Sequence, residues 1–303
     1  MDKVKRVLVY IVKDQAAPQR VQFLQSVTGF FSDGEDQVDV SFSLEDSRFL
    51  VSRGAGGPGP GTPLKRPSFC PIKHLSAAED VPLDVQQRGV DVGVAILLQT
   101  ANQRVLLTRR AQQLHIFPNV WVPPGGHVEP EETLLAAGLR ELQEETGLHL
   151  RPDQVSPQVL GLWESVFPHM LSRGRPQRHH IVVYMLLLSS LSHLQLQPSL
   201  KPCPAEVSAS VWVDRRLAAA IVSSMDGEEG DVCVDELPSR VSVTQVSADS
   251  ALTQALLPTH VFTRTAPVSG PDVERVSTGT KYALKLWLRS LETPELRPQT
   301  SDL

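Results

Sequence analysis

Apolar and polar positions alternate with a period of two in several stretches of the chain, which is typical of half-buried β-strands. Residues 38–44 show the pattern most clearly, because four apolar side chains alternate there with aspartate and serine. The same period, or a short apolar run, predicts strands at residues 7–12, 90–98, 104–109, 155–167, 180–188 and 206–213. The turn residues between the second and third of these predict a hairpin.

Apolar positions three and four residues apart predict helices elsewhere. Between Thr133 and Gly147, the residues Leu135, Leu139 and Leu142 recur at i, i+4 and i+7. Thr133 suits the start of a helix, and Gly147 suits a left-handed cap at its end. Further helices are predicted at residues 19–31, 215–222 and 278–291. The mixture of strands and helices predicts the α/β class.

The helix between Thr133 and Gly147 also gathers negative charge on one face. Glu141, Glu144 and Glu145 lie at i, i+3 and i+4, which makes them neighbours on a helix. Like charges at this spacing destabilise a helix, and the sequence places too few cations nearby to offset them. A divalent cation with oxygen ligands fits best. The alternative is a solvated acidic surface, but the glycine-rich turn just before the helix favours a phosphate site.

The loop and helix at residues 126–148 resemble the Nudix box of the Nudix hydrolase family. The fixed positions of that pattern are filled by Gly126, Glu132, Arg140, Glu141, Leu142, Glu144, Glu145, Gly147 and Leu148. The resemblance implies an α-β-α sandwich with a mixed central sheet, and hydrolysis of a nucleoside diphosphate linked to another group. It also implies that Glu132 pairs with Arg140 to orient the loop and helix, and that Gly126 offers a carbonyl ligand to the metal.

Clustered carboxylates predict Mg²⁺ or Mn²⁺ as the cofactor, since both ions favour oxygen ligands. Glu141 and Glu145 are the predicted main ligands. Glu144 is the predicted general base, and it also lies within reach of the metal. The predicted reaction is the hydrolysis of a phosphoanhydride. A nucleotide-binding regulator without turnover is the alternative from another class, and the complete set of glutamates argues against it.

Changes in composition divide the chain into four segments. Residues 1–64 are predicted to form a small α/β accessory domain, and residues 65–87 a linker that continues a stretch rich in glycine and proline. Residues 88–236 are the predicted Nudix hydrolase domain. Residues 237–303 are a predicted C-terminal extension with one helix. The polar, acidic stretch at residues 223–250 is predicted to be a loop.

The overall composition is ordinary for a globular protein, with 41% hydrophobic and 21% charged residues and a net charge of -5. This charge argues against a generally basic nucleic-acid binder and leaves room for a local basic patch. The three cysteines lie far apart and suit a reducing compartment. No apolar run reaches the roughly 18 residues of a membrane-spanning helix. We therefore expect a cytoplasmic protein, with a nuclear location also open.

The predicted hairpin tip at residues 168–179 carries Arg173, Arg175 and Arg178. These arginines are either solvated surface or a basic lip that steers an anionic substrate to the metal site. His179 and His180 lie next to each other on a strand, so at most one of them points into a cleft.

Three aromatic residues are candidates for stacking on a nucleobase, with core packing as the alternative for each. They are Trp121, Phe117 and Trp163.

Residues 66–71, 106–110, 121–126 and 178–184 resemble a Nudix subgroup of mRNA cap hydrolases. That resemblance implies cleavage of methylguanosine-capped mRNA to methyl-GDP and RNA with a 5′-monophosphate. A pyrophosphohydrolase of coenzyme A, dinucleotides or nucleotide sugars is the alternative. Residues 106–110 resemble part of the coenzyme A signature, but its downstream arginine and glycine are absent and Pro124 replaces its Phe-Pro pair.

Overall fold

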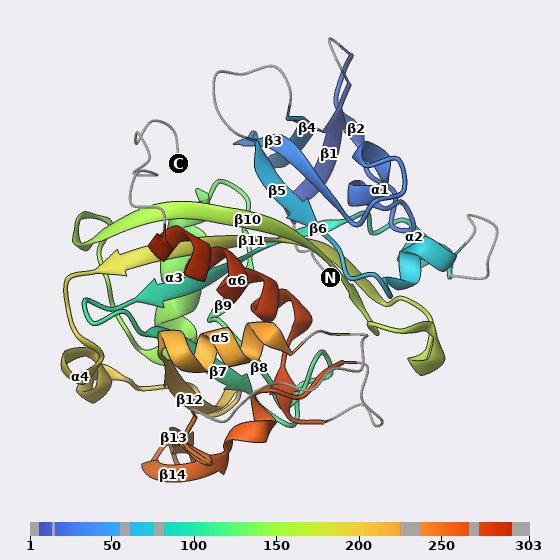
Figure 1. Ribbon diagram of the computed structural model, residues 1–303. Helices are drawn as coiled ribbons and strands as arrows, with labels where there is room; N and C mark the ends of the chain where they lie inside the picture. Colours follow the sequence, from blue (N-terminus) through green and yellow to red (C-terminus); the bar gives the residue numbers. More distant parts are fainter. Residues whose placement is uncertain are drawn as a thin grey trace.

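The structure is a computed structural model that describes residues 6–13, 16–54, 61–75, 82–224, 226, 237–266 and 273–292. Within these ranges, the strands join into one sheet of 15 strands (Figure 1). The helices are α1 (Val27–Phe31), α2 (Leu83–Gln86), α3 (Leu134–Thr146), α4 (His193–Leu196), α5 (Arg215–Ser223) and α6 (Thr278–Glu292). None of these described helices is long and apolar enough to cross a membrane.

The strands of the sheet fall into three groups along the chain. The first group is β1 (Leu8–Val12), β2 (Gln19–Arg20), β3 (Gln37–Glu45), β4 (Arg48–Arg53) and β5 (Thr62–Lys65). The central group is β6 (Asp91–Gln99), β7 (Val105–Arg110), β8 (Val120–Val122), β9 (Gly125–His127), β10 (Val155–Phe167), β11 (Arg178–Ser189) and β12 (Val207–Val213). The last group is β13 (Arg240–Val246), β14 (Leu252–Pro258) and β15 (Arg275–Val276).

Strand β6 shows how the layers form. It runs parallel to β11, which is antiparallel to β10, so the sheet is mixed. Val94 and Ile96 belong to a core cluster that includes α3, whereas Ala95 and Leu97 belong to a second cluster that includes α5 and α6. Successive side chains of a strand point to opposite faces, so helices cover both sides of the sheet (Figure 1). The predicted α-β-α sandwich with a mixed sheet is confirmed.

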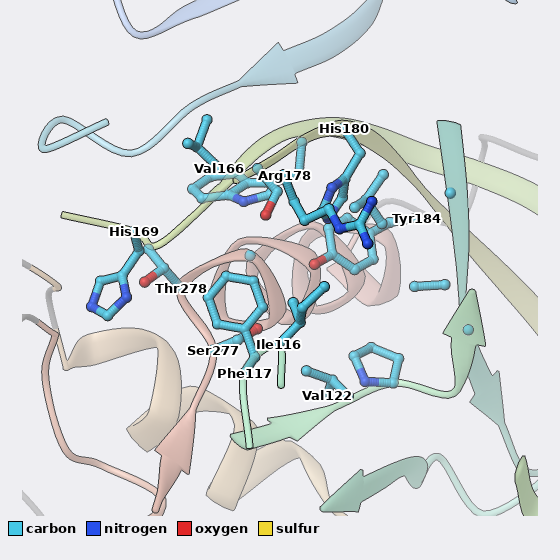
Figure 2. Close-up of a pocket in the computed structure, with 18 of the residues that line it drawn as sticks. Ile116, Phe117, Val122, Val166, His169, Arg178, His180, Tyr184, Ser277 and Thr278 are labelled. Carbon is cyan, nitrogen blue, oxygen red and sulfur yellow. The ribbon is translucent and has the colours of Figure 1, made fainter. Parts of the chain in front are cut away.

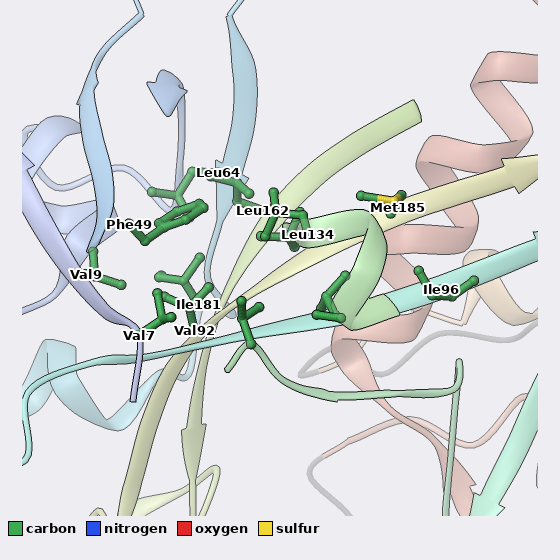
Figure 3. Close-up of a cluster of buried hydrophobic side chains, with 14 of the residues drawn as sticks. Val7, Val9, Phe49, Leu64, Val92, Ile96, Leu134, Leu162, Ile181 and Met185 are labelled. Carbon is green, nitrogen blue, oxygen red and sulfur yellow. The ribbon is translucent and has the colours of Figure 1, made fainter. Parts of the chain in front are cut away.

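The N-terminal strands continue the same sheet. β5 pairs with β10, and β1 pairs with β6 where Leu8 meets Asp91. Side chains from both sides of this junction form one buried cluster, with Phe49 and Leu64 beside Leu162 (Figure 3). The division into segments 1–64, 65–87, 88–236 and 237–303 stays a prediction. The hydrophobic core runs across its first two boundaries.

A buried carboxylate fixes the N-terminal region to the central strands. Glu164 of β10 is fully buried and accepts hydrogen bonds from the backbone amides of Val27 and Thr28 at 2.8 and 2.9 Å. It also accepts one from Ser26 Oγ at 3.0 Å and contacts His179 Nε2 at 3.0 Å. These contacts hold the pKa of Glu164 at about 2, against the opposing effect of burial. A charge from the central sheet thus caps the first turn of α1.

Two sequence predictions were wrong in detail. The helix predicted over residues 19–31 covers only Val27–Phe31, because Ser26 caps it there and the preceding residues form a turn in which Gln25 N donates to Gln22 O at 2.9 Å. The loop predicted over residues 223–250 contains β13, which pairs with β14 at the edge of the sheet. Residues 225 and 227–236 of that stretch lie outside the described residues, as do residues 293–303. The predicted helix at 278–291 is confirmed as α6.

Candidate active site

Helix α3 begins and ends where local sequence signals require. Thr133 Oγ1 accepts a hydrogen bond from Ala136 N at 3.1 Å, which caps the first turn. Gly147 ends the helix with a φ of 74°, a left-handed conformation that favours glycine. The face with Leu134, Ala137 and Leu142 packs on the sheet, which turns the glutamates of the other face toward a cleft of about 420 Å³.

The cleft brings together the residues predicted as metal ligands and base. Gly126, Glu141, Glu144 and Glu145 all line it. Glu144 is exposed, Glu141 is half-buried, and Glu145 is only 6% exposed. Burial raises the pKa of Glu141, and it raises the pKa of Glu145 to about 8. The three carboxylates of one helix face therefore differ in solvation, from open water to the protein interior.

Arg140 organises this acidic face. Its Nε donates to Glu132 Oε1 at 2.7 Å and its Nη2 donates to Glu132 Oε2 at 3.0 Å, a bidentate pair that lowers the pKa of Glu132. Its Nη1 donates to Glu141 at 2.8 Å and to Glu144 at 3.2 Å. The expectation that the nearby cations are too few to offset the glutamates was thus wrong in part, because one guanidinium contacts two of them. The sequence shows that Arg140 is adjacent to Glu141, but it does not show which side chains the guanidinium contacts, because the side-chain rotamer decides that.

The donor set of the cleft fits a hard divalent cation. Glu145 Oε2 is buried and has no hydrogen-bond partner within the described residues, although an isolated buried carboxylate oxygen is costly. At Gly126, a Cβ atom would lie 2.3 Å from Glu141 Oε1, so only glycine lets that carboxylate approach the strand. Oxygen ligands of this kind suit Mg²⁺ and Mn²⁺.

The carboxylates do not yet converge on one point. Among the described side chains, no three acidic, histidine or cysteine groups meet at distances that would hold a metal ion. Glu141 and Glu144 instead turn to the Arg140 guanidinium. We attribute the separation of the carboxylates to this contact, since Arg140 supplies a positive charge between Glu141 and Glu144.

A second cavity of about 290 Å³ opens beside the cleft, and the two share Arg110, Gly125, Gly126 and His127. Figure 2 shows side chains that line this cavity. Aromatic side chains form much of its wall. Phe117, Trp163 and Tyr184 line it, as do the polar residues His169, Arg178, His180, Arg275, Ser277 and Thr278. The two spaces together match a substrate with a phosphate chain and an attached ring system.

The residues predicted to bind substrate divide between this cavity and other places. Arg178 lines the cavity, whereas Arg173 and Arg175 lie on the hairpin tip and line neither space. His180 faces the cavity and His179 is buried against Glu164, so one histidine of the pair points inward as predicted.

Trp121 requires a correction. It is fully buried, its ring packs against Phe262 at 5.2 Å, and its Nε1 donates to Glu274 at 3.1 Å. It lies in the core of the other face and lines neither the cleft nor the cavity. A ring in this position does not stack on a ligand. Phe117 and Trp163, the other two aromatic candidates, do line the cavity.

Several residues of the site were not found from the sequence. Glu129 and, just before β12, Glu206 add two more carboxylates to the cleft, and the charge of Glu206 raises the pKa of Glu145. Arg275, Ser277 and Thr278 come from the C-terminal segment, about 150 residues beyond the glycine-rich turn at residues 123–126. No spacing signal links these positions, because only the tertiary fold brings them together.

Comparisons with known proteins agree with this geometry. A model of the NUDIX domain matches residues 88–227. The m7GpppN-mRNA hydrolase NUDT17 of Danio rerio is 58% identical over 96% of this chain and 98% of its own length. The proteins of the same name from Xenopus laevis and Homo sapiens are 49% and 45% identical, over 97% and 90% of this chain and 98% and 85% of their own lengths. The chain therefore belongs to the Nudix hydrolase family, in the group of the NUDT17 proteins.

Proposed function

We propose that this Nudix hydrolase cleaves the cap of m7GpppN-mRNA, with Mg²⁺ or Mn²⁺ as its cofactor, and releases m7GDP and RNA with a 5′-monophosphate. The proposal rests on relatives that carry the name m7GpppN-mRNA hydrolase and match nearly the whole chain. Members of the Nudix family use divalent metal ions. A cytoplasmic or nuclear location, where capped transcripts occur, belongs to the same proposal.

The structural observation that best supports the proposal is that the cleft and the cavity meet at Gly125 and Gly126. A phosphate chain in the cleft would lie along the acidic face of α3. A nucleoside attached to that chain would then reach the aromatic cavity. This arrangement supports a nucleotide-containing substrate whose phosphoanhydride lies at the boundary between the two spaces.

In this proposal, a water molecule attacks a phosphorus atom of the triphosphate bridge while the bond from that phosphorus to the bridging oxygen breaks. Glu144 accepts the proton of the water, since it is the exposed carboxylate of the three and keeps only a 3.2 Å bond to Arg140. Glu141, Glu145 and the Gly126 carbonyl would hold the metal. When bound, the metal would neutralise charge on the phosphates and lower the pKa of water. Glu132 and Arg140 position the loop and the helix.

A substrate panel tests the proposal. The full chain is incubated with capped RNA, coenzyme A, dinucleoside polyphosphates and nucleotide sugars, with Mg²⁺, with Mn²⁺ and with a chelator. We expect release of m7GDP from capped RNA with either metal and none with the chelator. Faster turnover of any small molecule at equal concentration would replace the proposed substrate. Absence of all hydrolysis, with metal binding intact, would favour a nucleotide-binding regulator.

A further inference from the structure

The C-terminal segment forms one wall of the cavity. Arg275, Ser277, Thr278 and Gly279 line it, although the match to the family model ends at residue 227. We call these four residues the C-terminal wall. The wall belongs to this chain and not to the shared Nudix domain, so it is a place where substrate choice can differ from that of other family members.

The wall is held rigidly against the central strands. β15 pairs in parallel with β8, and Ser277 N donates to Trp121 O at 3.1 Å. Ser277 Oγ accepts from Thr280 N at 3.0 Å and so caps α6. A Cβ atom on Gly279 would lie 2.5 Å from Tyr184 Oη and 3.0 Å from the Trp163 ring, so the start of α6 touches both aromatic side chains. Rigid placement of this kind suits a recognition site.

The wall presents hydrogen-bond donors to the cavity. Arg275 is only 5% exposed, and within the described residues its guanidinium donates from Nη1 to Val276 O at 3.1 Å. The other guanidinium N–H groups exceed what that single carbonyl can satisfy. The first intrahelical hydrogen bond of α6 joins Lys281 N to Ser277 O, so the preceding amides of Thr278 and Gly279 have no intrahelical acceptor.

The opposite side of the cavity has two unsatisfied polar side-chain atoms. His169 Nε2 and His180 Nδ1 are buried and have no hydrogen-bond partner within the described part of the chain. Burial lowers the pKa of His169 to about 4 and that of His180 to about 3, so both imidazoles are neutral near pH 7. Neutral imidazoles can pair with a polar ring edge without adding charge. Figure 2 shows both side chains around the same space as Phe117.

Within the described residues, the charged side chains that line the cavity are all positive. Arg110, Arg178 and Arg275 line it, and none of the described lining residues is aspartate or glutamate. Asp226, whose charge acts on Arg275, does not line the cavity and pairs with Lys281 at 2.7 Å. A cationic ring buried here would meet like charges without a carboxylate to pair with it, which is costly. N7-methylguanine is such a ring, and methylation also removes its N7 acceptor.

We propose that the C-terminal wall binds the acceptor atoms of an uncharged nucleobase, and that the cavity therefore takes the transcript-side nucleoside of the cap instead of N7-methylguanine. The identification of the nucleoside rests on the proposed function. Arginine pairs well with base acceptors such as guanine O6 and N7, and aromatic side chains stack on base faces. Arg275 is then a specificity residue, and Trp163 and Phe117 supply the stacking surface.

Binding of isolated nucleotides tests the wall without turnover. Affinities of the full chain for GMP, GDP and m7GDP are measured by calorimetry; GDP and m7GDP differ only in the methyl group and its charge. We expect GDP to bind about tenfold more tightly than m7GDP, the order of one bidentate base contact. Arg275→Met should remove that difference by weakening GDP and GMP alone. Arg151→Met, an exposed arginine that pairs with Asp153 and lines neither the cleft nor the cavity, is the matched control and should change nothing.

The opposite ranking would overturn the inference. If m7GDP binds as tightly as GDP or more tightly, or if Arg275→Met leaves GDP binding unchanged, the wall does not select an uncharged base. Should Arg275→Met fail to fold, Arg275→Lys keeps the charge and loses the bidentate geometry, and it should still weaken GDP binding. On m7GpppG, Arg275→Lys should raise KM and leave kcat near the wild-type value. If the chain prefers GDP in an Arg275-dependent way and yet does not cleave capped RNA, the proposed function fails while the neutral-base site stands.

Discussion

The acidic cleft and the neighbouring cavity meet at Gly125 and Gly126, but they are built in different ways. Three of the cleft's acidic groups come from one helix of 13 residues, α3, whose start, end and buried face are fixed by local signals. The cavity is lined by residues of strands β6, β10 and β11, of the loop around Phe117, and of the C-terminal wall. The acidic face of α3 is thus encoded in a contiguous stretch, whereas the cavity depends on the whole fold.

The comparison predicts that, among single substitutions, one in the cleft lowers the rate of hydrolysis most. Glu144→Gln should lower kcat by at least about 10²-fold with little change in KM, because removal of a positioned general base costs about 10²–10⁴-fold. Glu131→Gln, an exposed glutamate in the loop just before α3 that lines neither space, is the matched control. Single-turnover rates on capped RNA provide the measurement. Full turnover in Glu144→Gln would transfer the base role to another carboxylate of the cleft.

The next effect concerns the strands that carry the cavity wall. The pKa of Glu164 in the folded chain is about 2, below its ordinary value of 4.5, so its contribution to stability is complete above about pH 4.5 and is lost as the pH falls toward 2. The linked free energy is about 3 kcal/mol. Glu164→Gln should therefore unfold at lower urea concentration than the wild type at pH 7, and the gap should narrow below pH 4.5. A gap independent of pH would show that Glu164 acts only through packing.

A third prediction addresses how the cleft is positioned. Arg140→Lys keeps a positive charge but cannot reproduce the bidentate pair with Glu132 at 2.7 and 3.0 Å. We expect kcat/KM to fall by about 10–100-fold, the usual cost of losing a partner that orients metal ligands. Glu132→Gln should have a similar effect, and the double variant should cost little more than either single change. Effects that add fully would mean that the two residues act independently of their pair.

The same contrast explains how much could be predicted from the sequence. The limits of α3, the acidic face and the layered fold follow from Thr133, Gly147 and the periodicity of apolar residues, which are local properties. Other features depend on contacts between residues that are distant in the sequence. These are the burial of Trp121, the pairing of β13 with β14, and the position of Arg275 at the cavity, which pairs in β15 with Val120, about 150 residues earlier. Side-chain rotamers set the Arg140 contacts, and a sequence pattern does not specify them.

The smallest effect should come from the hairpin tip, and it separates RNA binding from base selection. Arg173→Ala with Arg175→Ala should raise KM for capped RNA a few-fold and leave m7GpppG unchanged, because neither residue lines the cavity and any contact would be to the RNA backbone. The salt dependence of RNA binding should flatten by roughly 0.7 in log–log slope for each phosphate that the protein no longer neutralises. Arg178→Ala, which removes a cavity residue, should instead weaken both substrates. An unchanged salt slope in the double variant would leave the tip as solvated surface and assign all substrate contacts of this hairpin to Arg178 and His180.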